Sequence, residues 1–299
     1  MLRLSKILSI CLAVILLTGC ASMQQTEPGI AATTAPVAQF AREIVAGTDL
    51  QVAQLITDSV SCVHDYSLSV RQMELVQCAE IVLLSGAGLE EFMEDALASA
   101  ETVVDCSANV VLNQLQGHDH NHDHGESHDH GHDHENDPHI WLDPMRAAQM
   151  AENICTGLSA CYPEYRELFR TNTDALVQRL AELQAYGEQA LENLSCRELI
   201  TFHDGFGYLA SAFDLEIVAA IEEESGSEAS ARTLTELVQL VEHHSLPAIF
   251  TEVNGSPSAA SVLHRETGAA VWTLDMAMGG SDYFEAMKHN IDTLKEALQ

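Results

Sequence analysis

The chain has 299 residues, of which 46% are hydrophobic, so it holds enough apolar material for a buried core and is not disordered throughout. Its 45 Asp and Glu residues outnumber its 13 Lys and Arg residues, which gives a formal net charge of −32. A nucleic-acid binder needs a basic face, so this charge excludes that class of function, and we expect the chain to attract cations instead.

Residues 1–20 are predicted to form an export signal peptide that is not part of the fold. A positively charged start is followed by an apolar run from Ile7 to Leu17, which is too short to span a bilayer stably. The segment ends in LTGC at Cys20, which resembles the lipobox of bacterial lipoproteins, in which the cysteine is lipidated. We therefore predict lipidation of Cys20, a polar tether over 21–28, and a folded part that is extracytoplasmic and lipid-anchored to the cell membrane. A plain signal peptide and a single anchor helix are the alternatives.

Residues 29–160 predict a first α/β lobe, because short apolar runs alternate with helical stretches. The predicted strands are 29–34, 50–57, 81–85 and 102–105, and the predicted helices are 36–46, 68–78 and 89–98. This order predicts a parallel sheet with helices on both faces.

The segment 117–135, GHDHNHDHGESHDHGHDHE, contains no hydrophobic residue, so we predict a disordered loop. Repeated imidazoles bind transition metals weakly and at several sites, which predicts an auxiliary metal-binding segment. An inert solvated charge run and an expression tag are the alternatives. The histidines of this loop are His118, His120, His122, His124, His128, His130, His132 and His134.

A linking helix is predicted over 161–194, because no Pro or Gly occurs between Pro163 and Gly187 and leucines recur near helical spacing. A second α/β lobe follows over 195–299. Its predicted strands are 198–202, 216–220, 248–252 and 270–274, and its predicted helices are 233–243, 258–266 and 283–298. The predicted fold class is therefore α/β, with two lobes whose parallel sheets are flanked by helices, joined by one long backbone helix.

Six cysteines follow the signal segment. An even count in an exported chain predicts disulfides, and the sequence leaves their pairing open, with Cys155 and Cys161 close enough in sequence for a local bridge. The six are Cys62, Cys78, Cys106, Cys155, Cys161 and Cys196.

Candidate metal ligands come from both predicted lobes. In doubly wound sheets, ligands bind beyond the carboxyl ends of the strands, so the acidic and imidazole side chains there are candidates. The first lobe offers His64 and His139, and the second offers His203 and Asp275. Three imidazoles and one carboxylate suit tetrahedral Zn²⁺. The alternative for each histidine taken alone is a hydrogen-bonded surface residue. The remaining histidines are predicted to lie on helix surfaces; they are His243, His244, His264 and His289.

Several motifs together resemble one protein family. They are the lipobox, the internal His-rich loop, SGAGLEEF at 85–92, DPHIWLDP at 137–144 and FHDGFGYL at 202–209. In this combination the chain resembles the zinc/manganese solute-binding lipoproteins of bacterial ABC importers, and specifically their zinc type with a His-rich loop.

The resemblance implies two α/β lobes linked by one long helix, with a metal between them. It places His64, His139, His203 and Asp275 on the family's ligand positions. Manganese members commonly carry Glu where this chain has His203, which favours Zn²⁺ and leaves Mn²⁺ as the alternative. The chain departs from the family pattern around His64, which lies in CVHDYS instead of DPHYEP, and after Asp275, where the usual proline is replaced by Met276.

The expected function is that of a monomeric zinc-binding component of an ABC-type importer, not an enzyme, that delivers Zn²⁺ to a membrane permease whose ATPase is a separate chain. Two alternatives stay open. A surface adhesin or metal reservoir would need no permease. A zinc hydrolase would need an open coordination position and a general base, for which the acidic run Glu222 to Glu224 is a candidate, but the chain has no HExxH motif.

Overall fold

The computed structural model describes residues 28–57, 66–114, 136–220, 230–253 and 257–299. Several predicted features lie outside the described residues. They are the signal peptide with Cys20, nearly all of the tether, Cys62, His64, the His-rich loop and Glu222 to Glu224. Within the described ranges, no helix is both long enough and apolar enough to cross a membrane.

The first lobe is built on a four-stranded parallel sheet with the order β2-β1-β3-β4. Its strands are β1 (Ile30–Ala32), β2 (Val52–Gln54), β3 (Ile81–Leu84) and β4 (Val103–Asp105), and its helices are α2 (Ala35–Ile44), α3 (Val70–Cys78) and α4 (Glu94–Leu97). The strands β1 and β3 are almost wholly buried because helices cover both faces, as the continuous apolar runs predict.

The predicted helix over 89–98 is wrong in its first half. The 3₁₀ turn η1 (Glu91–Met93) and the single-turn helix α4 take its place. The cause lies in the preceding turn, where Gly86, Ala87 and Gly88 all have positive φ, so the chain leaves β3 in a left-handed conformation that cannot start a helix directly.

The second lobe repeats the plan, with a four-stranded parallel sheet in the order β6-β5-β7-β8. Its strands are β5 (Glu198–Thr201), β6 (Glu216–Ala220), β7 (Ala248–Glu252) and β8 (Ala270–Leu274), and its helices are α7 (Gly207–Ala212), α8 (Ala231–His244), α9 (Pro257–Thr267) and α10 (Tyr283–Leu298). The predicted α/β class with two parallel sheets is therefore confirmed.

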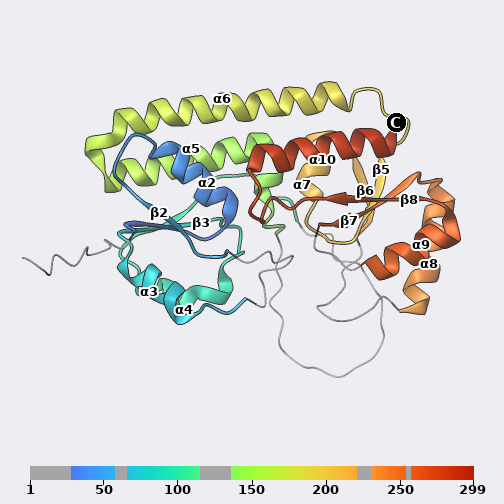
Figure 1. Cartoon of the computed structure of the whole chain (residues 1–299), viewed down its shortest axis with the longest axis horizontal. Coiled ribbons are helices and arrows are strands. Elements are labelled where there is room, and N and C mark those ends of the chain that lie inside the picture. Colours follow the sequence, from blue (N-terminus) through green and yellow to red (C-terminus); the bar gives the residue numbers. More distant parts are fainter. Residues whose placement is uncertain (1–27, 58–65, 115–135, 221–229, 254–256) are drawn as a thin grey trace, which may run out of the picture.

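A layer of helices joins the two lobes. The long helix α6 (Arg166–Ala190) has 25 residues. In Figure 1 it runs along the top of both lobes, with α5 (Pro144–Cys161) beneath it over the first lobe and α10 beneath it over the second. At 1.5 Å per residue α6 is about 38 Å long. The largest buried apolar cluster includes residues of both lobes and of α6, so the lobes share one continuous core.

The helix α5 (Pro144–Cys161) is an element that the sequence analysis did not identify. It begins where the Asp143 carboxylate accepts hydrogen bonds from the amides of Met145 and Arg146, with Pro144 in the first turn. The 3₁₀ turn η2 (Ile140–Leu142), which contains the fully buried Trp141, comes directly before it.

The expected disulfides are absent from the described part of the chain, where Cys78, Cys106, Cys155, Cys161 and Cys196 are all free thiols. The local bridge between Cys155 and Cys161 is wrong because both residues lie in α5. Six helical positions separate them by about 9 Å along the axis, beyond the reach of a disulfide.

The turn that follows β3 is closed by a buried glutamate. The Glu90 carboxylate accepts hydrogen bonds from the Thr33 hydroxyl (2.5 Å), the Ser85 amide (2.7 Å) and the Gly86 amide (3.0 Å). Burial nevertheless raises the pKa of Glu90 to about 7, because desolvation of the carboxylate outweighs these hydrogen bonds and the Asp105 carboxylate adds repulsion.

We predict that Glu90 makes the protein less stable as the pH rises from about 4.5 to about 7. In this window the folded state holds the Glu90 proton while the unfolded chain has released it, so raising the pH favours unfolding. The free energy of unfolding of wild type, measured by urea denaturation relative to Glu90→Gln, should fall by on the order of 3 kcal/mol across the window and then level off. A difference that is independent of pH would contradict this prediction.

A second prediction concerns Gly187 in α6. A Cβ atom there would lie 2.2 Å from Cε1 of the buried Phe213 ring. Gly→Ala in a helix usually stabilises by about 1 kcal/mol. Here we expect Gly187→Ala to destabilise by about 1–3 kcal/mol, because the ring must move in a packed core. The same substitution in a Phe213→Leu background serves as the control and should cost less; an equal cost would show that the ring is not the obstacle.

Candidate metal site

Two of the four predicted ligands face each other across the junction of the lobes. His139 directly precedes η2 in the first lobe, and His203 follows β5 in the second. Their Nε2 atoms are 3.4 Å apart and their rings are nearly perpendicular, at 85°. His139 is buried and His203 is half-buried, so this pair of nitrogens lies in a site with restricted access to water.

The His139 ring is oriented by Asp137. One carboxylate oxygen, Asp137 Oδ1, lies 2.8 Å from His139 Nδ1 and accepts the backbone N–H of His139 at 2.9 Å. An ionised carboxylate can only accept hydrogen bonds, so this contact selects the tautomer with the proton on Nδ1. The lone pair of Nε2 is then directed toward His203, as the carboxylate–histidine pairs of metal sites require.

The His203 ring is held from a different strand. Glu252, which is buried at the end of β7, places its Oε1 atom 3.7 Å from His203 Nδ1. Gly205 packs directly against the other edge of the ring, where a Cβ atom would lie 2.5 Å from His203 Cδ2 and 2.7 Å from Nε2. The ring therefore has an acidic group on one side and no room to move on the other.

The separation of the two nitrogens matches what one zinc ion requires. Two nitrogens that bind Zn²⁺ at about 2.0–2.1 Å with tetrahedral angles lie about 3.3–3.4 Å apart. The distance of 3.4 Å between the Nε2 atoms of His139 and His203 falls in that range. The donors present are neutral imidazole nitrogens, which suit zinc and other transition metals better than Mg²⁺ or Ca²⁺.

Asp275 follows β8 in the same region of the second lobe, but its carboxylate is engaged locally. It accepts hydrogen bonds from the Ala277 amide (2.8 Å) and the Ser281 hydroxyl (3.2 Å). Among the residues that the structure describes, no group of three or more His, Cys, Asp or Glu side chains is arranged to hold a metal. The ligand roles of all four residues therefore stay predictions, and His64 lies outside the described ranges.

The other described histidines lie away from this pair. His243 and His244 end α8, where His244 contacts Glu198, and His264 Nδ1 is 2.8 Å from the carbonyl of Ala269. His289 is exposed on α10. These are the surface histidines that the sequence predicts.

The two carboxylates that support the imidazoles were not among the predicted site residues. Asp137 carries a recognisable signal, because it precedes Pro138 in a turn-forming dipeptide and Asp side chains in turns commonly accept the backbone N–H two residues on. Glu252 ends the predicted strand 248–252, so the rule about strand carboxyl ends places it in this region, but residue types alone do not indicate its contact with His203.

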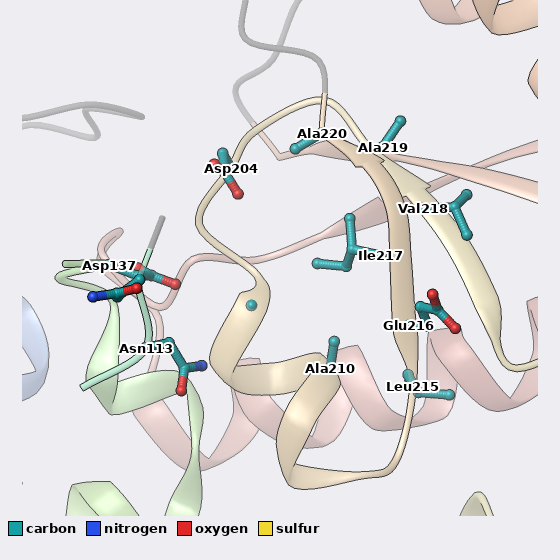
Figure 2. Close-up of a pocket in the computed structure, with 12 residues that line it drawn as sticks. Asn113, Asp137, Asp204, Ala210, Leu215, Glu216, Ile217, Val218, Ala219 and Ala220 are labelled. Carbon is teal, nitrogen blue, oxygen red and sulfur yellow. The ribbon is translucent and has the colours of Figure 1, made fainter. Parts of the chain in front are cut away.

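A cavity of about 460 Å³ lies next to Asp137, the residue that orients His139. Figure 2 shows it between Asn113 and Asp137 on one side and the edge strand β6 on the other, with Asp204 above. The described side chains that line it include the carboxylates of Asp137, Asp204 and Glu216 and no basic residue. Asp137 therefore borders both this cavity and the His139 ring.

Comparisons with known proteins agree on one family. The family model described as "ZnuA: Zinc-uptake complex component A periplasmic" matches residues 30–297. Zinc-binding protein AdcA of Streptococcus pyogenes serotype M3 is 28% identical over 285 residues, which cover 89% of this chain and 55% of the relative. The chain thus spans about half the length of the curated streptococcal relatives that it matches.

Solved structures give the same result for the fold. The Zn(II)-bound ZnuA-like domain of Streptococcus pneumoniae AdcA is 26% identical, with a TM-score of 0.74 over 90% of this chain and 98% of that one. The laminin-binding protein Lmb of Streptococcus agalactiae, described as bifunctional with adhesin and metal-transporting activity, is 22% identical, with a TM-score of 0.76 over 90% and 99%. At that identity the likeness to Lmb shows the fold alone.

We predict that Gly205→Ala weakens transition-metal binding at least about tenfold, because the new methyl group displaces the His203 ring from its oriented position. Gly280→Ala is the matched control: a Cβ atom at Gly280 would have no heavy atom within 4 Å, and the residue has no positive φ, so its replacement should leave affinity unchanged. Titration with Co²⁺, followed by its visible absorption, measures both variants. Equal affinities for the two would rule out a metal at His203.

Proposed function

Because the chain belongs to the ZnuA family of zinc-uptake components, we propose that it captures Zn²⁺ outside the cytoplasm and delivers it to a membrane permease. Members of this family are components of zinc-uptake complexes and not enzymes. The single observation that carries the proposal is the imidazole pair, in which one nitrogen from each lobe lies at the spacing of two zinc ligands.

The proposed ligand set is His64, His139, His203 and Asp275. Its support is the geometry of the pair, the position of Asp275 after β8 at the carboxyl edge of the sheet that also carries His203, and the family positions that these residues occupy. A set dominated by nitrogen favours Zn²⁺ over Mn²⁺, which prefers oxygen donors. The Zn(II)-bound state of the similar AdcA domain points the same way.

The arrangement also explains how capture and release are linked. Because His139 and His203 belong to different lobes, an ion held by both also ties the lobes together. Release requires the two nitrogens to separate or to be protonated, since a bound imidazole must be neutral. We propose that contact with the permease brings about this separation.

Two further parts of the proposal concern segments that the structure does not describe. Lipidation of Cys20 anchors the protein to the membrane, and the His-rich segment over 117–135 collects zinc or senses its abundance. The permease and its ATPase are separate chains, and the protein works as a monomer. For the adhesin alternative, the only support is a likeness of fold to Lmb, and the described residues add none.

The proposal predicts that a chain lacking residues 117–135 still binds one zinc ion tightly, and that His139→Ala combined with His203→Ala abolishes this binding. Loss of both nitrogens removes half of the proposed tetrahedral set, which leaves too few donors for a tight site. Isothermal titration calorimetry and metal analysis of the purified protein provide the measurement.

The control is the pair His243→Ala and His244→Ala, which removes two adjacent imidazoles at the far end of α8. This variant should keep the zinc stoichiometry of the loop-deleted chain. If the His139/His203 variant also kept it, the proposed function would lose its site.

A further inference from the structure

Tyr208 reaches from the second lobe into the first, next to the imidazole pair. It lies on α7, which begins shortly after His203, and its side chain is fully buried. Its hydroxyl donates to the carbonyl of Asp137 at 2.9 Å and accepts the amide N–H of Asn113 at 2.9 Å. A single oxygen thus satisfies two backbone groups of the opposite lobe.

Arg146 packs over the face of the Tyr208 ring. The guanidinium carbon lies 4.7 Å from the ring centroid, and the same guanidinium donates to the Asp143 carboxylate and to Asn113 Oδ1. Burial raises the pKa of Tyr208 to about 12, so the hydroxyl keeps its proton and remains a donor to Asp137 at physiological pH.

These contacts connect the two imidazoles through one short path. His203 and Tyr208 belong to the same segment, Tyr208 binds the backbone of Asp137, and the Asp137 carboxylate orients His139. Asp137 also donates its N–H to the carbonyl of Asn113 at 2.9 Å. The Tyr208 hydroxyl therefore contacts both residues of this backbone pair, one of which carries the carboxylate that orients His139.

We propose that the Tyr208 hydroxyl is a positioning group that holds the Asp137–His139 turn in register with His203 and thereby sets the affinity for a divalent transition-metal ion. The effect on affinity rests on the proposed function, whereas the effect on the His139 ring does not. Tyr208 touches no metal; it acts through the backbone of Asp137.

The test compares Tyr208→Phe with Tyr186→Phe in the full mature chain. Each substitution removes one hydroxyl and keeps the ring. The Tyr186 hydroxyl binds Asp292 and Lys288 between α6 and α10 and has no contact with the imidazole pair. Zinc affinity is measured by competition with a chelator, and the state of the His139 ring is read in the metal-free protein from its imidazole ¹⁵N shifts.

Tyr208→Phe should weaken zinc binding about tenfold to a hundredfold, as loss of a supporting hydrogen bond does at other metal sites. It should also shift the metal-free His139 signals away from the single Nδ1–H tautomer. Tyr186→Phe should change neither. The urea midpoints of both variants are recorded, so that a general loss of stability is recognised when it occurs.

Unchanged zinc affinity together with unchanged His139 signals in Tyr208→Phe would overturn the inference. So would weaker binding without any change at His139, since that pattern indicates a structural role alone. If wild type bound no zinc, the proposed function would fail, but altered His139 signals in Tyr208→Phe would still support the positioning role.

Discussion

The candidate metal site depends on two imidazole nitrogens, one from each lobe, that are held 3.4 Å apart. In the tautomer that Asp137 selects, the Nε2 lone pair of His139 points at the other ring, an arrangement that a proton or a cation between the nitrogens must stabilise. Surrounding contacts hold it in place. Besides Tyr208, the indole N–H of Trp141 donates to the carbonyl of Met276 at 2.8 Å, and the hydroxyl of Tyr283 donates to the carbonyl of Trp141 at 2.7 Å. The turn that carries His139 is thus bound to the second lobe at both of its ends.

The fold supplies these contacts through two geometric rules. The carboxyl ends of parallel strands meet at one edge of each sheet, which places His203 after β5 near Glu252 at the end of β7. The helical layer of α5, α6 and α10 then fixes the two sheet edges against each other (Figure 1). Since the buried apolar core runs through both lobes, a shift of one lobe disturbs packing as well as the site.

Much of the fold could be predicted from the sequence, and the reasons are local. The strands β7 and β8 and the helix α10 occur at the predicted bounds, because short β-branched runs and an Asp282 N-cap mark them. The helix α5 was not predicted, although the Asp143 N-cap followed by Pro144 is a local signal for a helix start. The disulfide prediction failed because a count of cysteines carries no geometry. His139 and His203 are 64 residues apart in the sequence. Residue types therefore predicted a shared site but not the contacts through Asp137 and Tyr208.

The acidic composition and the imidazole pair act at different distances. A net charge of −32 raises the concentration of every cation near the protein, but salt screens this attraction beyond about 8 Å, and charge alone does not separate zinc from calcium or magnesium. The carboxylates of Asp137, Asp204 and Glu216 in the cavity likewise attract cations without choosing among them. The site distinguishes zinc from calcium and magnesium only at His139 and His203, where the donors are nitrogen atoms of fixed direction instead of oxygen atoms. The selectivity of the site therefore depends less on how many carboxylates the chain carries than on the few hydrogen bonds that keep two ring nitrogens aimed at one point.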